Sequence, residues 1–231
     1  ARRLSGERPV VGIQSPALTG EHARYPSLRA LAAHYADLIL QMQPDGPHHL
    51  LGWSTGGILA QEIACQLQAR HARVGVVCLL DAYPADAWRD RAPAEAHDVW
   101  RAILHIAGQD PDVLAADGPL TRERVIGFLR AQKHPLGDLT DAQLHGIFEA
   151  VAASNTMVKT HPHQRYDGEL LYFRAALDHV GENLHPDMWA PWAESLAVHD
   201  VPSLHAHMPG EAALAHWLPV LEEALADKER G

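Results

Sequence analysis

Short hydrophobic runs alternate with segments of helical spacing along most of this chain. An apolar run of about four to eight residues, bounded by turn residues, is typical of a strand buried on both faces of a parallel sheet. Such runs predict strands at residues 10–14, 48–52, 74–81, 168–175 and 196–201. Apolar residues three or four positions apart predict helices with these buried faces: Leu28, Leu31, Tyr35, Leu38 and Met42; Leu59, Ile63 and Leu67; and Leu214, Leu218, Leu221 and Leu225. This alternation predicts an α/β fold with a mostly parallel sheet.

The alternation is interrupted after residue 84. Up to about residue 160 there is no convincing strand pattern, and helical segments are predicted near 95–107, 121–133 and 140–154. A helical insertion between two strands of a parallel sheet is typical of a lid above the strand ends. We therefore expect a single domain over residues 1–231, with a core of about 1–84 and 161–231 and a helical lid of about 85–160. A plain helical layer is the alternative interpretation.

The clearest chemical signal is the pentapeptide Gly52-Trp53-Ser54-Thr55-Gly56, which joins a predicted strand to a predicted helix. A G-x-S-x-G motif in that context is typical of the nucleophile elbow of α/β-hydrolases, where a sharp turn exposes the serine hydroxyl. We expect glycine at positions 52 and 56 because side chains there would clash with neighbouring backbone. The motif predicts Ser54 as a catalytic nucleophile, and a structural serine in a glycine turn is the alternative.

A serine hydroxyl needs a neighbouring base, because it is a poor nucleophile while it keeps its proton. In α/β-hydrolases the base is a histidine on the loop between the last strand and the last helix. That loop contains both His205 and His207. The carboxylate that orients the base must follow a strand. Asp81 and Asp178 both meet this condition, so the spacing leaves two candidates for the base and two for the acid.

Composition limits the remaining function classes. With 19 Lys and Arg against 29 Asp and Glu, the formal net charge of −10 argues against nucleic-acid binding. No run is long and apolar enough to span a bilayer, and no apolar stretch follows the first charged residues, so we expect a cytoplasmic protein. Cys65 and Cys78 are predicted to be buried free thiols. The 17 histidines have no carboxylate or cysteine at a recognised ligand spacing, so we predict no metal and no cofactor.

Residues 33–39 and 43–57, together with the segment Leu79-Leu80-Asp81-Ala82-Tyr83-Pro84, resemble terminal thioesterase domains of nonribosomal peptide synthetases. The enterobactin-synthase type is the most similar, since it shares the Trp189-Ala190-Pro191-Trp192 stretch. The resemblance implies the α/β-hydrolase fold, with helices on both faces of the sheet and a helical lid insertion. It also implies that Asp81 is the acid rather than Asp178. His205 is implied as the base rather than His207, because in this family the histidine precedes a short hydrophobic step and a methionine, as in His205-Ala206-His207-Met208.

The resemblance further implies a function. This family releases a peptidyl or acyl chain, carried as a thioester on the phosphopantetheine of a carrier domain, through an acyl-enzyme, by hydrolysis or macrocyclisation. For this chain it implies a serine thioesterase of antibiotic-type biosynthesis with no cofactor of its own and an upstream carrier domain as its partner. Ser54 would carry the acyl group, the Thr55 N–H would face the oxyanion, and Trp53 and Tyr83 would contact the substrate. Packing beneath the elbow is the alternative role of Trp53.

The chain departs from the family pattern in two places. Ser203 stands where a glycine often precedes the family's histidine. In addition, such domains begin with a strand and a His-Pro-Gly-Gly-like loop that supplies a second oxyanion donor, and this first part of the sheet is expected to be missing here. Three other functions stay open at this stage: a stand-alone editing thioesterase, a general carboxylesterase, and a catalytically silent module that docks carrier domains.

Overall fold

The computed structural model describes residues 8–15, 25–92, 94–178 and 183–230. The chain forms two compact units. Unit 1 comprises residues 1–12, 25–90 and 158–231, and unit 2 comprises residues 13–24 and 91–157. The insertion predicted from the sequence at about 85–160 thus corresponds closely to the main segment of unit 2.

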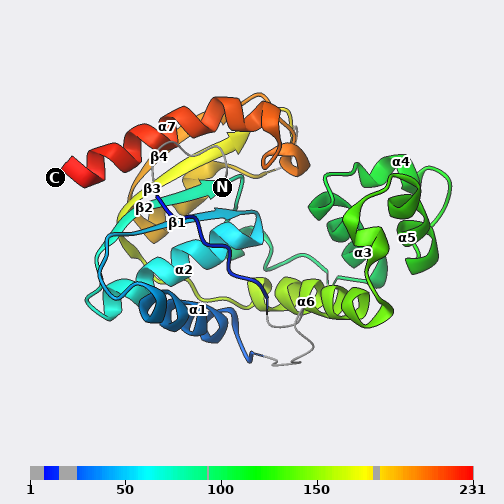
Figure 1. Cartoon of the computed structure of the whole chain (residues 1–231), viewed down its shortest axis with the longest axis horizontal. Coiled ribbons are helices and arrows are strands. Elements are labelled where there is room, and N and C mark those ends of the chain that lie inside the picture. Colours follow the sequence, from blue (N-terminus) through cyan, green and yellow to red (C-terminus); the bar gives the residue numbers. More distant parts are fainter. Residues whose placement is uncertain (1–7, 16–24, 93, 179–182, 231) are drawn as a thin grey trace. The chain divides into compact units, whose positions relative to one another are not determined.

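A parallel four-stranded sheet forms the centre of unit 1 (Figure 1). Its strands are β1 (His48–Trp53), β2 (Val74–Leu80), β3 (Tyr166–Ala175) and β4 (Ala193–Val201), and they lie side by side in chain order. The central strand β2 is apolar throughout and almost entirely buried, as expected of a parallel strand covered on both faces. Four of the predicted strands are confirmed, and each lies within a few residues of its expected position.

Helices cover both faces of this sheet (Figure 1). On one face, α2 (Thr55–Ala69) packs against β1 and β2, and α1 (Leu28–Met42) packs against α2. Ser27 begins α1 by accepting a hydrogen bond from the Ala30 N–H on its hydroxyl, a standard N-cap. On the other face lies α7 (Glu211–Arg230). This arrangement confirms the α/β architecture.

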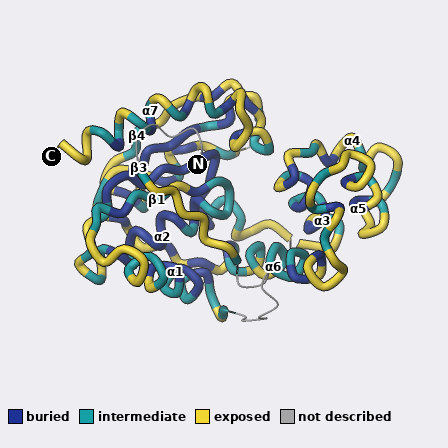
Figure 2. Tube along the Cα trace, viewed as in Figure 1, coloured by how far each residue is buried: buried dark blue, intermediate teal, exposed yellow. Residues whose placement is uncertain are grey.

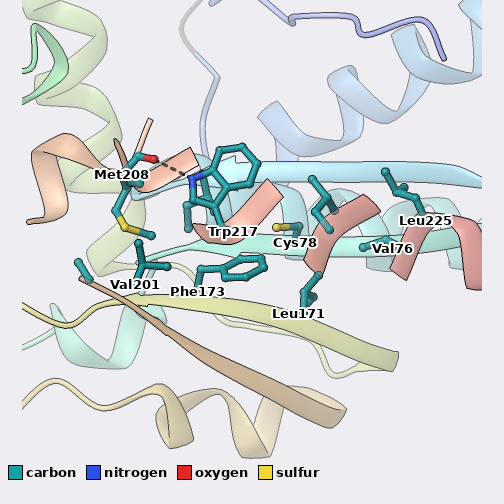
Figure 3. Close-up of a cluster of buried hydrophobic side chains, with 12 residues drawn as sticks. Val76, Cys78, Leu171, Phe173, Val201, Met208, Trp217 and Leu225 are labelled. Atoms are coloured by element: carbon teal, nitrogen blue, oxygen red, sulfur yellow. Dashed lines mark hydrogen bonds between the residues drawn. The ribbon is translucent and has the colours of Figure 1, made fainter. Parts of the chain in front are cut away.

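The core between α7 and the sheet is drawn in Figure 3. Side chains of a strand alternate between its two faces, and Val76, Cys78 and Leu80 of β2 therefore all contact the α7 side. The indole of Trp217 lies over the sheet near Phe173, with ring centroids 6.3 Å apart. Its Nε1 donates to the Met208 carbonyl at 2.9 Å, so this core also ties α7 to the loop that follows β4. Figure 2 colours the chain by burial, and β2 and the carboxyl-terminal half of β3 are almost entirely buried.

The prediction of a strand at residues 10–14 is wrong. Residues 8–15 have no regular secondary structure, and Val10 and Val11 are 48% and 56% exposed. A strand needs a neighbour that satisfies its backbone N–H and C=O groups. Among the described strands none pairs with this run, so its apolar character alone does not produce a strand.

Unit 2 is helical within its described residues, as the sequence predicts. It contains α3 (Ala96–Ile106), α4 (Pro111–Ala115), α5 (Arg122–Ala131) and all but the end of α6 (Asp141–Lys159). The sequence does not predict the short helix α4; its N-cap is Asp110, whose side chain accepts from the Asp112 N–H. The helices share a core of their own, which includes Val99, Trp100, Leu104, Val125, Leu129 and Leu144. None of the helices in the described ranges is long and apolar enough to cross a membrane.

Candidate active site

Sheet geometry brings the predicted catalytic residues to one edge. Ser54 directly follows β1 and Asp81 directly follows β2, and the register pairs Trp53 with Leu80. The two parallel strands therefore end at the same level, and the Ser54 N–H donates to the Leu80 carbonyl at 3.1 Å. His205 begins the short 3₁₀ helix η5 (His205–His207), four residues after the end of β4. Segments distant in the sequence thus meet at the carboxyl ends of the strands, where α/β proteins bind their ligands.

Ser54 has the backbone conformation of a nucleophile elbow. Its φ of 55° and ψ of −128° lie in a region that non-glycine residues rarely adopt, at a cost of roughly 1–3 kcal/mol. The helix α2 begins at the next residue. Thr55 therefore contributes one of the first amide groups of that helix, which have no carbonyl partner within the helix and are suited to an anion. This agrees with the expected role of the Thr55 N–H toward an oxyanion.

Of the two elbow glycines expected to be required, the structure supports only Gly52, and it adds Gly57. A Cβ at Gly52 would lie 2.0 Å from the Gly56 carbonyl oxygen, so glycine is obligatory there. A Cβ at Gly56 would meet nothing within 4 Å, and the expectation for this position is wrong. The second close approach is at Gly57, where a Cβ would lie 2.3 Å from Cβ of Ala82. The first turn of α2 passes so close to the segment after β2 that only glycine fits.

The three predicted catalytic side chains form one continuous hydrogen-bonded chain. His205 Nε2 lies 3.1 Å from Ser54 Oγ, and His205 Nδ1 lies 2.7 Å from Asp81 Oδ2. If Nδ1 carries the proton that it donates to the carboxylate, Nε2 accepts from the serine hydroxyl. This is the arrangement in which an imidazole can take a proton from a serine.

Asp81 is held in place by several further contacts. It is 1% exposed, and its Oδ1 accepts the Ala175 N–H at 3.0 Å and the Tyr83 hydroxyl at 3.2 Å. Burial, together with the charge of Asp81, raises the pKa of Tyr83, so the phenol keeps its proton and remains a donor. The carboxylate is thus hydrogen-bonded on both oxygens, as a buried charge requires.

The structure separates the two pairs of candidates that the spacing left open. The imidazole that faces Ser54 and Asp81 belongs to His205, whereas His207 is exposed. Asp178 does bond to His205, but at the backbone: its Oδ2 accepts the His205 N–H at 2.8 Å. Geometry therefore favours the Asp81 and His205 pair that the resemblance implied.

The two residues expected to contact substrate have other contacts in the structure. Trp53 is half-buried, its Nε1 donates to the His205 carbonyl at 3.0 Å, and its ring lies 5.4 Å from the His205 ring. This supports the packing alternative for Trp53. Tyr83 is only 3% exposed and its hydroxyl is bound to Asp81, so a substrate contact by Tyr83 is not supported.

A buried polar cluster in unit 1 is not predicted by the sequence. Glu62 is fully buried and lies 3.2 Å from Arg29 Nε and 3.3 Å from His161 Nε2. His163 accepts the Ala85 N–H on Nε2 at 2.9 Å, and burial lowers the pKa of His163 to about 3. These contacts join segments distant in sequence, so no local motif signals them. Within the described ranges, no group of three or more His, Cys, Asp or Glu side chains could hold a metal ion.

The cysteines offer no second nucleophile. Cys65 and Cys78 are both free and buried, as predicted. Burial raises the pKa of the Cys65 thiol to about 12, and burial raises that of Cys78 as well. A thiol needs a lowered pKa to act as a nucleophile near neutral pH, so neither cysteine competes with Ser54.

The chain is similar to known proteins in both sequence and structure. A family model for the thioesterase domain matches residues 1–216. Enterobactin synthase component F of Escherichia coli strain K12 is 30% identical over 229 residues, which are 97% of this chain and 16% of that protein. The structure of holo-AB3403, a four-domain nonribosomal peptide synthetase bound to AMP and glycine, superimposes with a TM-score of 0.74 at 20% identity, over 91% of this chain and 17% of that one. SrfTE, the thioesterase domain that cyclises the lipopeptide antibiotic surfactin, superimposes with a TM-score of 0.57 at 21% identity, over 84% and 74%.

The likeness to these solved structures confirms the α/β-hydrolase fold. The chain spans only 3% to 16% of the length of the first curated relatives that it matches, which are peptide synthetases. These relatives include the enterobactin-synthase type, so the resemblance seen in residues 33–57 and 79–84 is confirmed. With a family model that extends over residues 1–216, the chain belongs to the thioesterase domain family.

Proposed function

We propose that this chain releases a peptidyl or acyl chain from the phosphopantetheine thioester of a carrier domain, through an acyl-enzyme on Ser54. The observation that carries the proposal is the continuous hydrogen-bonded chain from Ser54 through His205 to Asp81, with distances of 3.1 Å and 2.7 Å. Membership of the thioesterase domain family supports a thioester substrate, and the peptide synthetases among its relatives support a carrier domain as the partner.

In the first half-reaction, His205 Nε2 takes the proton from Ser54 as Oγ attacks the thioester carbonyl. The buried Asp81 carboxylate stabilises the imidazolium that forms. The Thr55 N–H faces the developing oxyanion, and one such donor is worth about 10²–10³ in kcat. When the tetrahedral intermediate collapses, the C–S bond breaks and the pantetheine thiol leaves with the proton from His205.

In the second half-reaction, a nucleophile attacks the ester on Ser54 and His205 removes its proton. Water gives a free acid, whereas a hydroxyl or amine of the same chain gives a ring. SrfTE is a thioesterase domain that cyclises its lipopeptide, which makes ring formation a specific alternative to hydrolysis here. We assign the choice between the two to the helical segment 91–157, as a lid that controls access of water to the acyl-enzyme.

The test is the intact mass of the protein after exposure to a short acyl thioester of N-acetylcysteamine, with wild type and Ser54→Ala in parallel. The proposal predicts an increase by one acyl group in the wild type only, followed by loss of the adduct as free acid or cyclic product appears. The absence of any adduct or product would instead favour a silent carrier-docking module.

The same assay separates the other two alternatives. A matched oxygen ester cleaved as fast as the thioester would favour a general carboxylesterase. A strong preference for short acyl groups over peptidyl groups would favour a stand-alone editing thioesterase. Turnover of a peptidyl thioester loaded on a carrier domain, at a rate above that of both model substrates, is the result expected here.

A further inference from the structure

The loops that follow β3 and β4 stay hydrogen-bonded to each other beyond the sheet. The last register pair is Ala175 with Val201. After it, the Ala176 N–H donates to the Val201 carbonyl at 2.9 Å, and the Leu177 N–H donates to the Ser203 carbonyl at 3.1 Å. The two loops therefore continue the parallel pairing of the strands from which they emerge.

Beyond these two backbone hydrogen bonds, the next contact between the loops is made by a side chain. Asp178 Oδ2 accepts the His205 N–H at 2.8 Å, so the series reaches the residue that carries the imidazole. The carbonyl of the same residue accepts from Trp53 Nε1 at 3.0 Å. Both backbone hydrogen-bonding groups of His205 are thus bound by side chains, one from the loop after β3 and one from the end of β1.

This arrangement fixes the direction in which the His205 side chain leaves the backbone. The histidine sits at the start of η5, a 3₁₀ helix of three residues, and such a short element has little internal stability of its own. The imidazole must nevertheless reach Ser54 and Asp81 at the same time. A displacement of about 1 Å in a catalytic group can cost on the order of 10² in rate.

We propose that Asp178 and Trp53 are positioning residues that hold the His205 backbone so that its imidazole stays in line between Ser54 and Asp81. This inference rests on the proposed function, since it concerns the base of that reaction. Toward His205, Asp178 acts as a hydrogen-bond acceptor, because the group that it contacts there is a neutral backbone N–H. Asparagine keeps an acceptor oxygen at this position, whereas alanine removes it.

The experiment compares wild type, Asp178→Ala, Asp178→Asn and Trp53→Phe. Two rates are measured for each: kcat on the acyl thioester and the labelling of Ser54 by a fluorophosphonate. Asp178→Ala is expected to lower both rates by about 10- to 100-fold with little change in KM. Asp178→Asn is expected to recover to within about threefold of wild type, because the acceptor is restored. Trp53→Phe, which keeps a ring but loses the donor, is expected to lose about tenfold.

Asp200→Ala serves as the matched control. Asp200 forms an exposed ion pair with Arg174 across β3 and β4, at 2.6 Å, and its removal takes a carboxylate from the same pair of strands. The expected change in either rate is below about twofold. A comparable loss in Asp200→Ala and Asp178→Ala would overturn the proposal, since it would show a general effect of the strand pair.

Other results would overturn it as clearly. Asp178→Asn as slow as Asp178→Ala would show that Asp178 acts through its charge. Wild-type rates in Asp178→Ala and Trp53→Phe would show that the two contacts do not position the base. If Asp178→Ala fails to fold, the comparison of Asp178→Asn with Trp53→Phe still decides, because the first variant keeps both contacts and the second keeps only the one from Asp178. A wild type that is neither labelled nor active would instead refute the proposed function.

Discussion

Trp189 Nε1 donates a hydrogen bond to the Ala82 carbonyl at 2.6 Å, directly after the acid of the site. Trp189 is fully buried in the 3₁₀ helix η4 (Pro186–Trp192), which immediately precedes β4. The backbone next to Asp81 is therefore hydrogen-bonded to a helix that lies more than a hundred residues later in the sequence.

Substituting Trp189→Phe tests this support. The variant keeps an aromatic ring but leaves the Ala82 carbonyl without its donor in a buried environment, and we expect the free energy of unfolding to fall by about 1–3 kcal/mol. Trp192→Phe is the control, because Trp192 is half-exposed and donates to Asp86, and there the loss should stay below about 1 kcal/mol. Urea unfolding of both variants measures the difference. Equal losses would contradict a special role of Trp189.

The Asp81→Asn variant tests the acid. An amide at this position donates to His205 Nδ1, which forces the proton of the imidazole onto Nε2 and removes the acceptor for the Ser54 hydroxyl. We expect kcat on the acyl thioester to fall by on the order of 10⁴. Unfolding measurements should show a folded protein, because an Asn oxygen can still accept the Ala175 N–H. A loss of less than about 100-fold would argue that another group orients the base.

Alanine substitutions at the three elbow glycines should differ sharply in their effect on the free energy of unfolding. Gly52→Ala and Gly57→Ala place a Cβ within 2.0 Å and 2.3 Å of other atoms, and we expect each to lower the free energy of unfolding by about 3 kcal/mol or more. Gly56→Ala meets open space within a helix, so stability should stay the same or rise by up to about 1 kcal/mol. Thermal and urea unfolding of the three variants gives the ranking, and a strongly destabilised Gly56→Ala would contradict it.

The buried His163 predicts a pH dependence of stability. Its pKa is lowered from 6.5 to about 3 in the folded protein, mainly by burial and then by the neighbouring His161. Below pH 6.5 the unfolded chain binds a proton here that the folded protein does not. The contribution of the neutral His163 to the free energy of unfolding is thus complete above pH 6.5. It is lost as pH falls toward about 3, at about 1.4 kcal/mol per pH unit.

His163→Gln isolates this contribution. Glutamine can accept the Ala85 N–H and cannot be protonated in this range, so the slope of unfolding free energy against pH should become shallower by about 1.4 kcal/mol per pH unit between about pH 6 and 5. This window lies above the range of Glu62, whose pKa is lowered from 4.5: burial opposes the shift, but hydrogen bonds from His161 and Gln66 outweigh it. Equal slopes for wild type and variant would refute the assignment.

The sequence predicts the parts of this fold that depend on local pattern. The strand β2 is a continuous apolar run and the elbow is a five-residue motif, and both lie where expected. The run at residues 10–14 has a similar appearance, but strand formation depends on a neighbouring strand, which a local pattern does not reveal.

Within the site, the local sequence pattern does not predict which group each side chain contacts. Asp81 and Asp178 both follow a strand, and only the structure shows that one carboxylate meets the imidazole while the other meets the backbone of the same histidine. The contacts of Glu62, His161 and His163 depend on packing between distant segments. The same holds for the glycines, since the need for Gly57 comes from Ala82, which belongs to a different strand end.

The hydrogen bond between the Ala85 N–H and His163 joins the point where the chain leaves unit 1 to the point where it returns, 78 positions later. Ser54, Asp81, His205 and the side chains that hold them all belong to unit 1. Residues 91–157 therefore form a loop whose flanking segments are hydrogen-bonded to each other. The entropy cost of closing such a loop increases only slowly with its length. Segments of different length or sequence could replace residues 91–157 without changing Ser54, Asp81, His205 or the contacts that hold them.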